Sequence, residues 1–165
     1  MSTDTLTTLA ALVGAALKAQ GEMLATAESC TGGGIAEAVT RVAGSSAWFD
    51  RGFVTYSNRA KIESLGVDAG MLAKNGAVSE ETARAMAQGA LAKSAATLAL
   101  SVTGVAGPAG GTAEKPVGTV CFAWARNNGQ LASGRMLFAG DRDAVRRQSV
   151  IHALQGVLNM LDGTQ

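Results

Sequence analysis

The chain has 165 residues, 47% of them hydrophobic, and a formal net charge of +1. This length and composition support one domain, residues 1–165, with an ordinary hydrophobic core. The near-neutral charge argues against a nucleic-acid partner, and no apolar run approaches the roughly 20 residues that span a bilayer. Cys30 and Cys121 are too far apart to suggest a disulfide framework or metal-ligand spacing. Met1–Asp4 is polar rather than a basic and apolar leader, so we expect a cytoplasmic protein without a membrane partner.

Hydrophobic periodicity and turn residues predict alternating helices and strands, followed by a hairpin. In chain order we expect a helix at Thr3–Gln20, a strand at Met23–Ala27, a helix at Gly33–Val42, a strand at Phe53–Ser57, helices at Asn58–Leu65 (with Asn58 as N-cap) and Glu80–Lys93, a strand at Thr97–Val102, a glycine-rich loop at Thr103–Gly118, hairpin strands at Thr119–Ala125 and Leu131–Phe138, and a helix from the cap Asp141 to Leu161. This order predicts a three-layer α/β/α domain with a mixed sheet.

The segment Thr26–Gly34 reads Thr-Ala-Glu-Ser-Cys-Thr-Gly-Gly-Gly and joins a predicted strand to a predicted helix. It places the Ser29 hydroxyl and the Cys30 thiol beside backbone amides at a helix N-terminus. A nucleophile next to anion donors suits acyl transfer or amide hydrolysis. The same amides also suit passive phosphate binding, so the residues alone leave both interpretations open.

A serine nucleophile needs a base, and the sequence offers one histidine, His152. It lies inside the last predicted helix without an acidic sequence neighbour, so we expect a structural or surface role, and no ligand cluster indicates zinc. A lysine can act as the base when its pKa falls from about 10.4 towards about 7–8. Lys61 is the candidate, because a helix N-terminus disfavours a positive charge. The alternatives are an ordinary solvated Lys61 and a Tyr56 that is a core aromatic with a wet hydroxyl.

Two further stretches have an unusual composition. The run Gly104–Gly111 follows a predicted strand, where glycines let backbone amides approach a phosphate or a planar ring, although a mobile turn is the alternative. It is not a P-loop, because Lys115 lacks the required spacing. Arg142, Arg146 and Arg147 begin a helix whose dipole they oppose. Phosphate binding or a charge pair with a neighbouring aspartate would explain them.

Together these residues resemble the CinA C-terminal domain family over residues 6–161. The resemblance rests on motifs in the order of the family: Thr26–Gly33, Gly44–Ser46, Val54–Asn58, Gly76–Ser79, Thr103–Pro108, Lys115–Val120 and Gly140–Arg142.

The resemblance implies hydrolysis of nicotinamide mononucleotide to nicotinic acid mononucleotide and ammonia in pyridine nucleotide recycling, without metal or cofactor. It implies Ser29 as the nucleophile, Lys61 as its base, and Tyr56 as a group that assists proton transfer or holds Lys61. The other site residues that it implies are Cys30, Thr31, Gly32, Ser46, Thr103, Gly104, Gly107 and Arg142. Of these, the amides of Cys30 to Gly32 would stabilise the oxyanion, and Thr103, Gly104, Gly107 and Arg142 would bind ribose and phosphate. Glu28 would match the pyridinium charge, and a homodimer or higher homo-oligomer is expected.

Two other hypotheses remain at this point. In the first, the Cys30 thiol is the nucleophile, activated by the helix N-terminus. In the second, the protein is a non-catalytic nucleotide-binding module in which the Gly32–Gly34 amides hold a phosphate.

Overall fold

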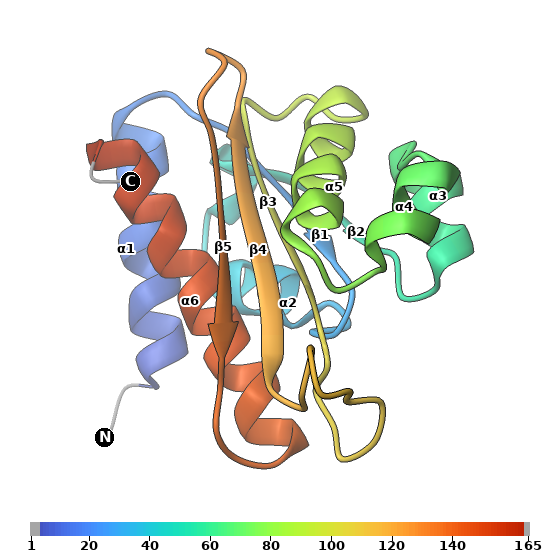
Figure 1. Cartoon of the computed structure of the whole chain (residues 1–165). Helices are drawn as coiled ribbons and strands as arrows, with labels where there is room; N and C mark the ends of the chain where they lie inside the picture. The colour runs from blue at the N-terminus through green and yellow to red at the C-terminus, as the bar shows by residue number, and fades with distance from the viewer. Residues whose placement is uncertain (1–3, 164–165) are drawn as a thin grey trace.

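The computed structural model describes residues 4–163 as an α/β fold built on one sheet (Figure 1). The elements in chain order are α1 (Thr5–Ala19), β1 (Leu24–Glu28), α2 (Gly34–Thr40), the short 3-10 helix η1 (Ser45–Ala47), β2 (Phe49–Val54), α3 (Asn58–Leu65), α4 (Ala69–Asn75), α5 (Glu80–Ala92), β3 (Leu98–Gly104), β4 (Thr119–Arg126), β5 (Leu131–Leu137) and α6 (Arg142–Asp162).

The sheet has five strands in the order β2-β1-β3-β4-β5. β1 pairs in parallel with both β2 and β3, whereas β4 runs antiparallel to β3 and to β5. The predicted mixed sheet is therefore confirmed. Because β1 has one parallel neighbour on each side, the carboxyl ends of β1 and β3 lie at a point where the strand order reverses, which is where open α/β sheets bind ligands.

The two faces of the sheet carry side chains of different size. On β3 and β4 the large residues alternate with small ones, as the two-residue period of a strand requires. The large ones, Leu98, Leu100, Val102, Val120, Phe122 and Trp124, pack in one core cluster against α1, α2 and α6. The small ones, including Ala99, Cys121, Ala123 and Ala125, face α5 on the other side, beside which lie α3 and α4 (Figure 1). These three layers confirm the predicted architecture.

The predicted elements are present, with two differences. The strand expected at Phe53–Ser57 was placed too late: β2 covers Phe49–Val54, and Ser57 rather than Asn58 caps α3, since the Ser57 side chain accepts a hydrogen bond from the Ala60 amide. The helix α4, which Asp68 caps, was not predicted. The expected start of the first helix at Thr3 lies outside the described residues.

Candidate active site

A cavity of about 220 Å³ lies at the carboxyl ends of β1 and β3. It is lined by Ser29, Cys30, Tyr56, Lys61, Ala77, Val78, Thr103, Gly104, Ala106 and Arg142. Ser29 directly follows β1, Lys61 lies in the first turn of α3, and Arg142 begins α6. The fold therefore brings together seven residues that the sequence pointed to, from segments far apart in the chain.

Lys61 is the largest fully buried side chain among the described residues, with 1% of its surface exposed. Its Nζ lies 2.9 Å from Ser29 Oγ, 2.9 Å from the Thr55 carbonyl and 3.2 Å from the Tyr56 carbonyl. The ion pairs found within residues 4–163 include none with Lys61. Burial lowers the pKa of this amine, because desolvation penalises the ammonium form.

The contacts of Lys61 also fix the direction of its lone pair. Carbonyl oxygens only accept hydrogen bonds, so the carbonyls of Thr55 and Tyr56 each require an N–H of the amine. A neutral amine has two N–H groups and one lone pair, and the remaining position faces Ser29 Oγ. The neutral form can therefore accept the serine proton within ordinary hydrogen-bond reach. A lowered pKa and this orientation are the two properties of a general base.

The turn that carries Ser29 is held from inside by Glu28, the last residue of β1. The fully buried Glu28 carboxylate accepts hydrogen bonds from the Thr31 hydroxyl at 2.5 Å and from the Ile35 and Ala36 amides at 2.8 and 3.1 Å. The carboxylate thus caps the N-terminus of α2, where its charge is stabilised by the helix dipole. Glu28 does not line the cavity, so its predicted contact with a pyridinium ring is not supported by its position.

Two amides of the glycine run Gly32–Gly34 are engaged within the protein. The Gly32 amide donates to the Ser29 carbonyl at 3.0 Å, and the Gly34 amide donates to the Thr31 carbonyl at 2.9 Å. With Glu28 occupying the first amides of α2, these groups do not form the phosphate cradle that the binding-module hypothesis requires. Because its amide is already hydrogen-bonded, Gly32 is no longer a candidate oxyanion donor. The amides of Cys30 and Thr31 remain candidates.

The Cys30 thiol is 5% exposed and packs in the main core cluster. Burial raises its pKa to about 12, so the thiolate is disfavoured at neutral pH. This is the opposite of the shift that a cysteine nucleophile requires, so the environment of Cys30 favours Ser29 as the nucleophile.

The outer end of the cavity is formed by Arg142 and Tyr56. One Arg142 nitrogen donates to the Gly107 carbonyl at 2.7 Å and another to the Tyr56 hydroxyl at 3.3 Å. The Tyr56 side chain is 64% exposed. It is the Tyr56 backbone carbonyl, not the hydroxyl, that contacts Lys61. Of the two predicted roles for Tyr56, the geometry favours holding Lys61 over proton transfer.

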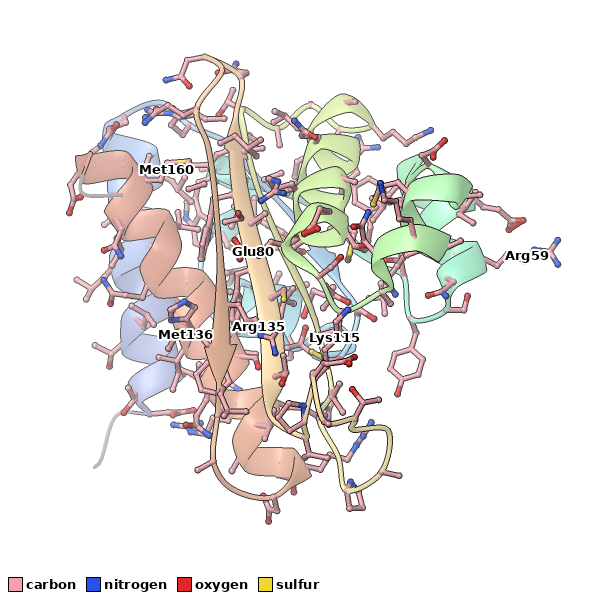
Figure 2. The ribbon with its side chains drawn as sticks, in the orientation of Figure 1. Arg59, Glu80, Lys115, Arg135, Met136 and Met160 are labelled. Carbon is pink, nitrogen blue, oxygen red and sulfur yellow. The ribbon has the colours of Figure 1, made fainter. Side chains whose placement is uncertain are left out.

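The end of β3 forms the wall of the cavity. The Thr103 hydroxyl is directed to the Ala77 carbonyl at 2.8 Å. A Cβ on Gly104 would lie 2.8 Å from the Thr119 carbonyl oxygen, so only glycine fits there. The loop after β3 is anchored by Lys115, which reaches across to the Asn75 carbonyl at the end of α4 (Figure 2). A second cavity, of about 450 Å³, continues beyond Ala106 and Arg142 and is also lined by Pro108, Val117, Gly140, Asp141 and Asp143.

Some predicted residues lie elsewhere. Ser46 is exposed in η1, which precedes β2 and therefore lies at the opposite end of the sheet, because β1 and β2 are parallel. His152 packs against Phe122, with ring centroids 4.5 Å apart, and burial lowers its pKa. Its predicted structural role agrees with this environment. Arg147 pairs with Asp4 at 3.0 Å, on the surface.

Sequence reasoning missed the lining residues Ala77, Val78 and Ala106. Ala77 and Val78 belong to the motif Gly76–Ser79, and Ala106 to Thr103–Pro108, so the resemblance carried a signal for them. It also missed the carbonyls of Thr55 and Tyr56, whose contacts depend on the tertiary fold. Arg146 was expected to bind a phosphate or pair with an aspartate, whereas its guanidinium donates to the carbonyls of Cys30 and Thr31.

The fold and this cavity define an α/β protein with a buried lysine amine against a serine hydroxyl at the carboxyl edge of its sheet. The model of the CinA C-terminal domain matches residues 6–161, and the chain belongs to this family. It is 54% identical over 158 residues to the nicotinamide-nucleotide amidohydrolase PncC of Enterobacter agglomerans, covering 96% of both chains. It is 55% identical to the protein of the same name from Escherichia coli K12, covering 94% of both chains. Among solved structures, the competence/damage inducible protein CihA from Agrobacterium tumefaciens matches with a TM-score of 0.93 at 46% identity, covering 98% of both chains.

Two negative findings concern the described residues. Within residues 4–163, no group of three or more His, Cys, Asp and Glu side chains is placed to hold a metal ion. In the same part of the chain, no helix has the length and apolar character needed to cross a membrane.

Proposed function

We propose that this protein is an amidohydrolase that converts nicotinamide mononucleotide to nicotinic acid mononucleotide and ammonia, with Ser29 as nucleophile and Lys61 as base. One observation carries the mechanism: the buried Lys61 amine lies 2.9 Å from Ser29 Oγ, with its other two positions on carbonyls. The substrate is supported by the names of relatives that are 54–55% identical over nearly the full chain.

The reaction begins when Ser29 Oγ attacks the carboxamide carbon and Lys61 accepts the hydroxyl proton. The oxyanion of the tetrahedral intermediate is stabilised by the amides of Cys30 and Thr31. When the C–N bond breaks, the Lys61 ammonium returns the proton to the leaving nitrogen, which departs as ammonia. Lys61 then removes a proton from water, the resulting hydroxide attacks the acyl-serine ester, and the protonated Lys61 returns a proton to Ser29 Oγ as the ester bond breaks. The carboxylic acid that leaves gives its proton to the released ammonia and becomes the nicotinate carboxylate.

The two adjoining cavities suit a substrate with two chemically different ends. The carboxamide enters the inner cavity beside Ser29, and the ribose and phosphate extend along Thr103 and Gly104 to Arg142, which the Gly107 carbonyl holds. Arg142 lines both cavities, so its guanidinium is available to an anion at their boundary.

The test is ammonia release from nicotinamide mononucleotide by wild type and by Ser29→Ala. The wild type should release ammonia, and the variant should be inactive with an unchanged circular dichroism spectrum, because the attacking oxygen is gone. Full activity of Ser29→Ala would exclude the serine mechanism. Tight binding by wild type without turnover would instead favour a nucleotide-binding module. The expected homo-oligomer stays a prediction, for which light scattering after gel filtration is the measurement.

A further inference from the structure

Arg146 lies on α6, one turn after Arg142, and its guanidinium contacts the turn that follows Ser29. Its Nε donates to the Cys30 carbonyl at 3.1 Å, and its Nη2 donates to the Thr31 carbonyl at 3.3 Å. The ion pairs within residues 4–163 include none with Arg146, whereas the next residue, Arg147, pairs with Asp4. Arg146 does not line the cavity. Its guanidinium is therefore directed to backbone rather than to substrate.

The two carbonyls determine where the neighbouring amides point. In a trans peptide group the C=O and N–H bonds point in opposite directions. Holding the Cys30 carbonyl therefore fixes the Thr31 N–H, and holding the Thr31 carbonyl fixes the Gly32 N–H, which donates to the Ser29 carbonyl at 3.0 Å. A carbonyl bound to a cation is also polarised, which strengthens the N–H of the same peptide group as a donor.

The local geometry leaves room for this contact. Gly32 has φ +57°, in the left-handed region that favours glycine, and a Cβ there would lie 3.3 Å from Arg146 Nη2. A larger residue at this position would crowd the guanidinium as well as strain the backbone. Glu28 holds the same turn from the opposite side through the Thr31 hydroxyl. The segment is thus fixed between a carboxylate within the fold and a guanidinium on α6.

We propose that Arg146 is a positioning residue of the amidase reaction, which orients the Cys30–Thr31 peptide group so that the Thr31 amide receives the developing oxyanion. This inference rests on the proposed function, since it assigns a role in the same reaction. It differs from a purely structural role in its kinetic signature. Misaligned oxyanion donors weaken binding of the transition state and leave binding of the substrate largely unchanged.

The experiment compares Arg146→Gln, Arg146→Lys and the neighbouring control Arg147→Gln in the ammonia-release assay. Because loss of one oxyanion donor costs about 10²–10³ in kcat, misalignment by Arg146→Gln should cost roughly 10–100-fold in kcat with KM changed less than about threefold. Arg146→Lys should recover part of the loss, since a point charge can reach one carbonyl but not both as a planar fork does. Arg147→Gln should stay within about twofold of wild type, because its ion pair is exposed.

Arg146→Ala, which removes the guanidinium but keeps Cβ, supplies a second measurement. Added guanidinium ion should raise kcat of Arg146→Ala, and should leave wild type and Arg147→Gln unchanged. A structural role alone predicts neither this rescue nor a selective effect on kcat. The proposal is overturned if Arg146→Gln matches Arg147→Gln, or if only KM rises. If Arg146→Gln does not fold, kcat of the folded Arg146→Lys decides, and a wild-type kcat there overturns the proposal.

Labelling of Ser29 by a fluorophosphonate separates this inference from the proposed function. The phosphoryl oxygen of the reagent needs the same amides, but the reaction does not need the nucleotide substrate. If wild type releases no ammonia, the proposed function fails, and the labelling rates decide on Arg146. Labelling of Arg146→Gln about tenfold slower than that of Arg147→Gln would support the positioning role. Equal rates, or an unlabelled wild type, would overturn it.

Discussion

The two ends of the cavity are built in different ways. At the inner end, Lys61 and the turn after Ser29 are buried, and several hydrogen bonds hold each of them. At the outer end, Arg142 and the Tyr56 side chain are exposed, and one hydrogen bond of 3.3 Å links them. A dry and fixed inner end suits proton transfer, whereas an exposed outer end suits recognition of a charged group that arrives from water.

Carboxylates cap two of the helices that begin near the cavity, α2 and α6. The carboxylate of Glu28 occupies the first amides of α2. The carboxylate of Asp141 caps α6 through the Ala144 amide, and leaves the Arg142 side chain to line the cavity. At α2 and α6 the N-terminus is therefore not by itself an anion site, because a carboxylate of the protein already accepts hydrogen bonds from first-turn amides. Changes at the inner end should lower kcat or stability, and changes at the outer end should raise KM.

The largest effect is expected for Lys61→Met, which keeps the length of the side chain and removes the amine. Because a positioned base contributes about 10²–10⁴ to the rate, kcat should fall by that factor, and steady-state ammonia release would measure it. Lys74→Met, at an exposed lysine on α4, is the control and should keep wild-type kinetics. A Lys61→Met variant with the kcat of wild type would contradict the proposed role of Lys61 as the base at the inner end.

Lys61 also gives both the rate and the stability a defined pH dependence. Its pKa is lowered from 10.5 by burial, and the neutral amine is the proposed base, so kcat/KM should rise with pH through the lowered pKa. Between this pKa and 10.5 the unfolded chain binds the proton and the folded one does not, so the free energy of unfolding should rise with pH across that window. The destabilisation is complete below the folded pKa and absent above 10.5. The difference between the free energies of unfolding of wild type and Lys61→Met, measured in urea titrations, should therefore change with pH across this window. A difference that is the same at every pH would contradict the lowered pKa of Lys61.

The next effect is on stability and concerns Glu28→Gln. An amide of the same shape cannot accept all three hydrogen bonds of the carboxylate, since one of its ends is a donor. Because hydrogen bonds to charged groups contribute about 1.5–3 kcal/mol, the free energy of unfolding should fall by about 2–3 kcal/mol in urea titrations. Glu37→Gln, on the exposed side of α2 where Glu37 pairs with Arg41, should lose under about 1 kcal/mol. Equal losses of unfolding free energy in the two variants would mean that Glu28 stabilises the turn after Ser29 no more than an exposed ion pair stabilises α2.

The sequence predicted the layers, the mixed sheet and the pairing of Ser29 with Lys61, but partly for a different reason from the one observed. The low pKa of Lys61 was expected from the helix N-terminus, whereas desolvation is its cause, and burial of a lysine does not follow from local sequence. The strand β2 was misplaced because it is an edge strand with exposed residues, so it lacks the apolar alternation of a half-buried strand. The short helix α4 buries only Leu72, which leaves little periodicity to detect.

The contacts that hold the site residues in place could not be predicted from the sequence. The contact of Arg146 with Cys30 joins residues 116 positions apart, and that of Arg142 with Gly107 joins residues 35 apart. Glu28 was expected to match the pyridinium charge of the substrate. Successive strand residues point to opposite faces, however, and this carboxylate turns under α2. Motifs therefore located residues that line the cavity, and tertiary contacts decided which neighbours of Ser29 touch it.

At the outer end, Arg142→Gln should raise KM for nicotinamide mononucleotide by about 10–100-fold, as expected for loss of a hydrogen bond to a charged group, with kcat nearly unchanged. Tyr56→Phe is the matched variant. It removes the hydroxyl that contacts Arg142 and keeps the carbonyl that contacts Lys61, so its effect on KM should be smaller. Steady-state kinetics of both variants test the division of the cavity. A large fall in kcat for Tyr56→Phe would instead assign its hydroxyl to proton transfer.

The smallest effect is expected for Cys30→Ala. This thiol lines the inner end, but burial raises its pKa to about 12, so it contributes no thiolate at neutral pH. Since the proposed oxyanion donor at this position is the backbone amide, kcat should stay within about threefold of wild type, a change below 1 kcal/mol. Activity after treatment with a thiol-alkylating reagent is the companion measurement. A fall in kcat of about 10²-fold or more in Cys30→Ala, with the fold intact, would show that the Cys30 thiol takes part in the reaction and would contradict the proposal that Ser29 alone is the nucleophile.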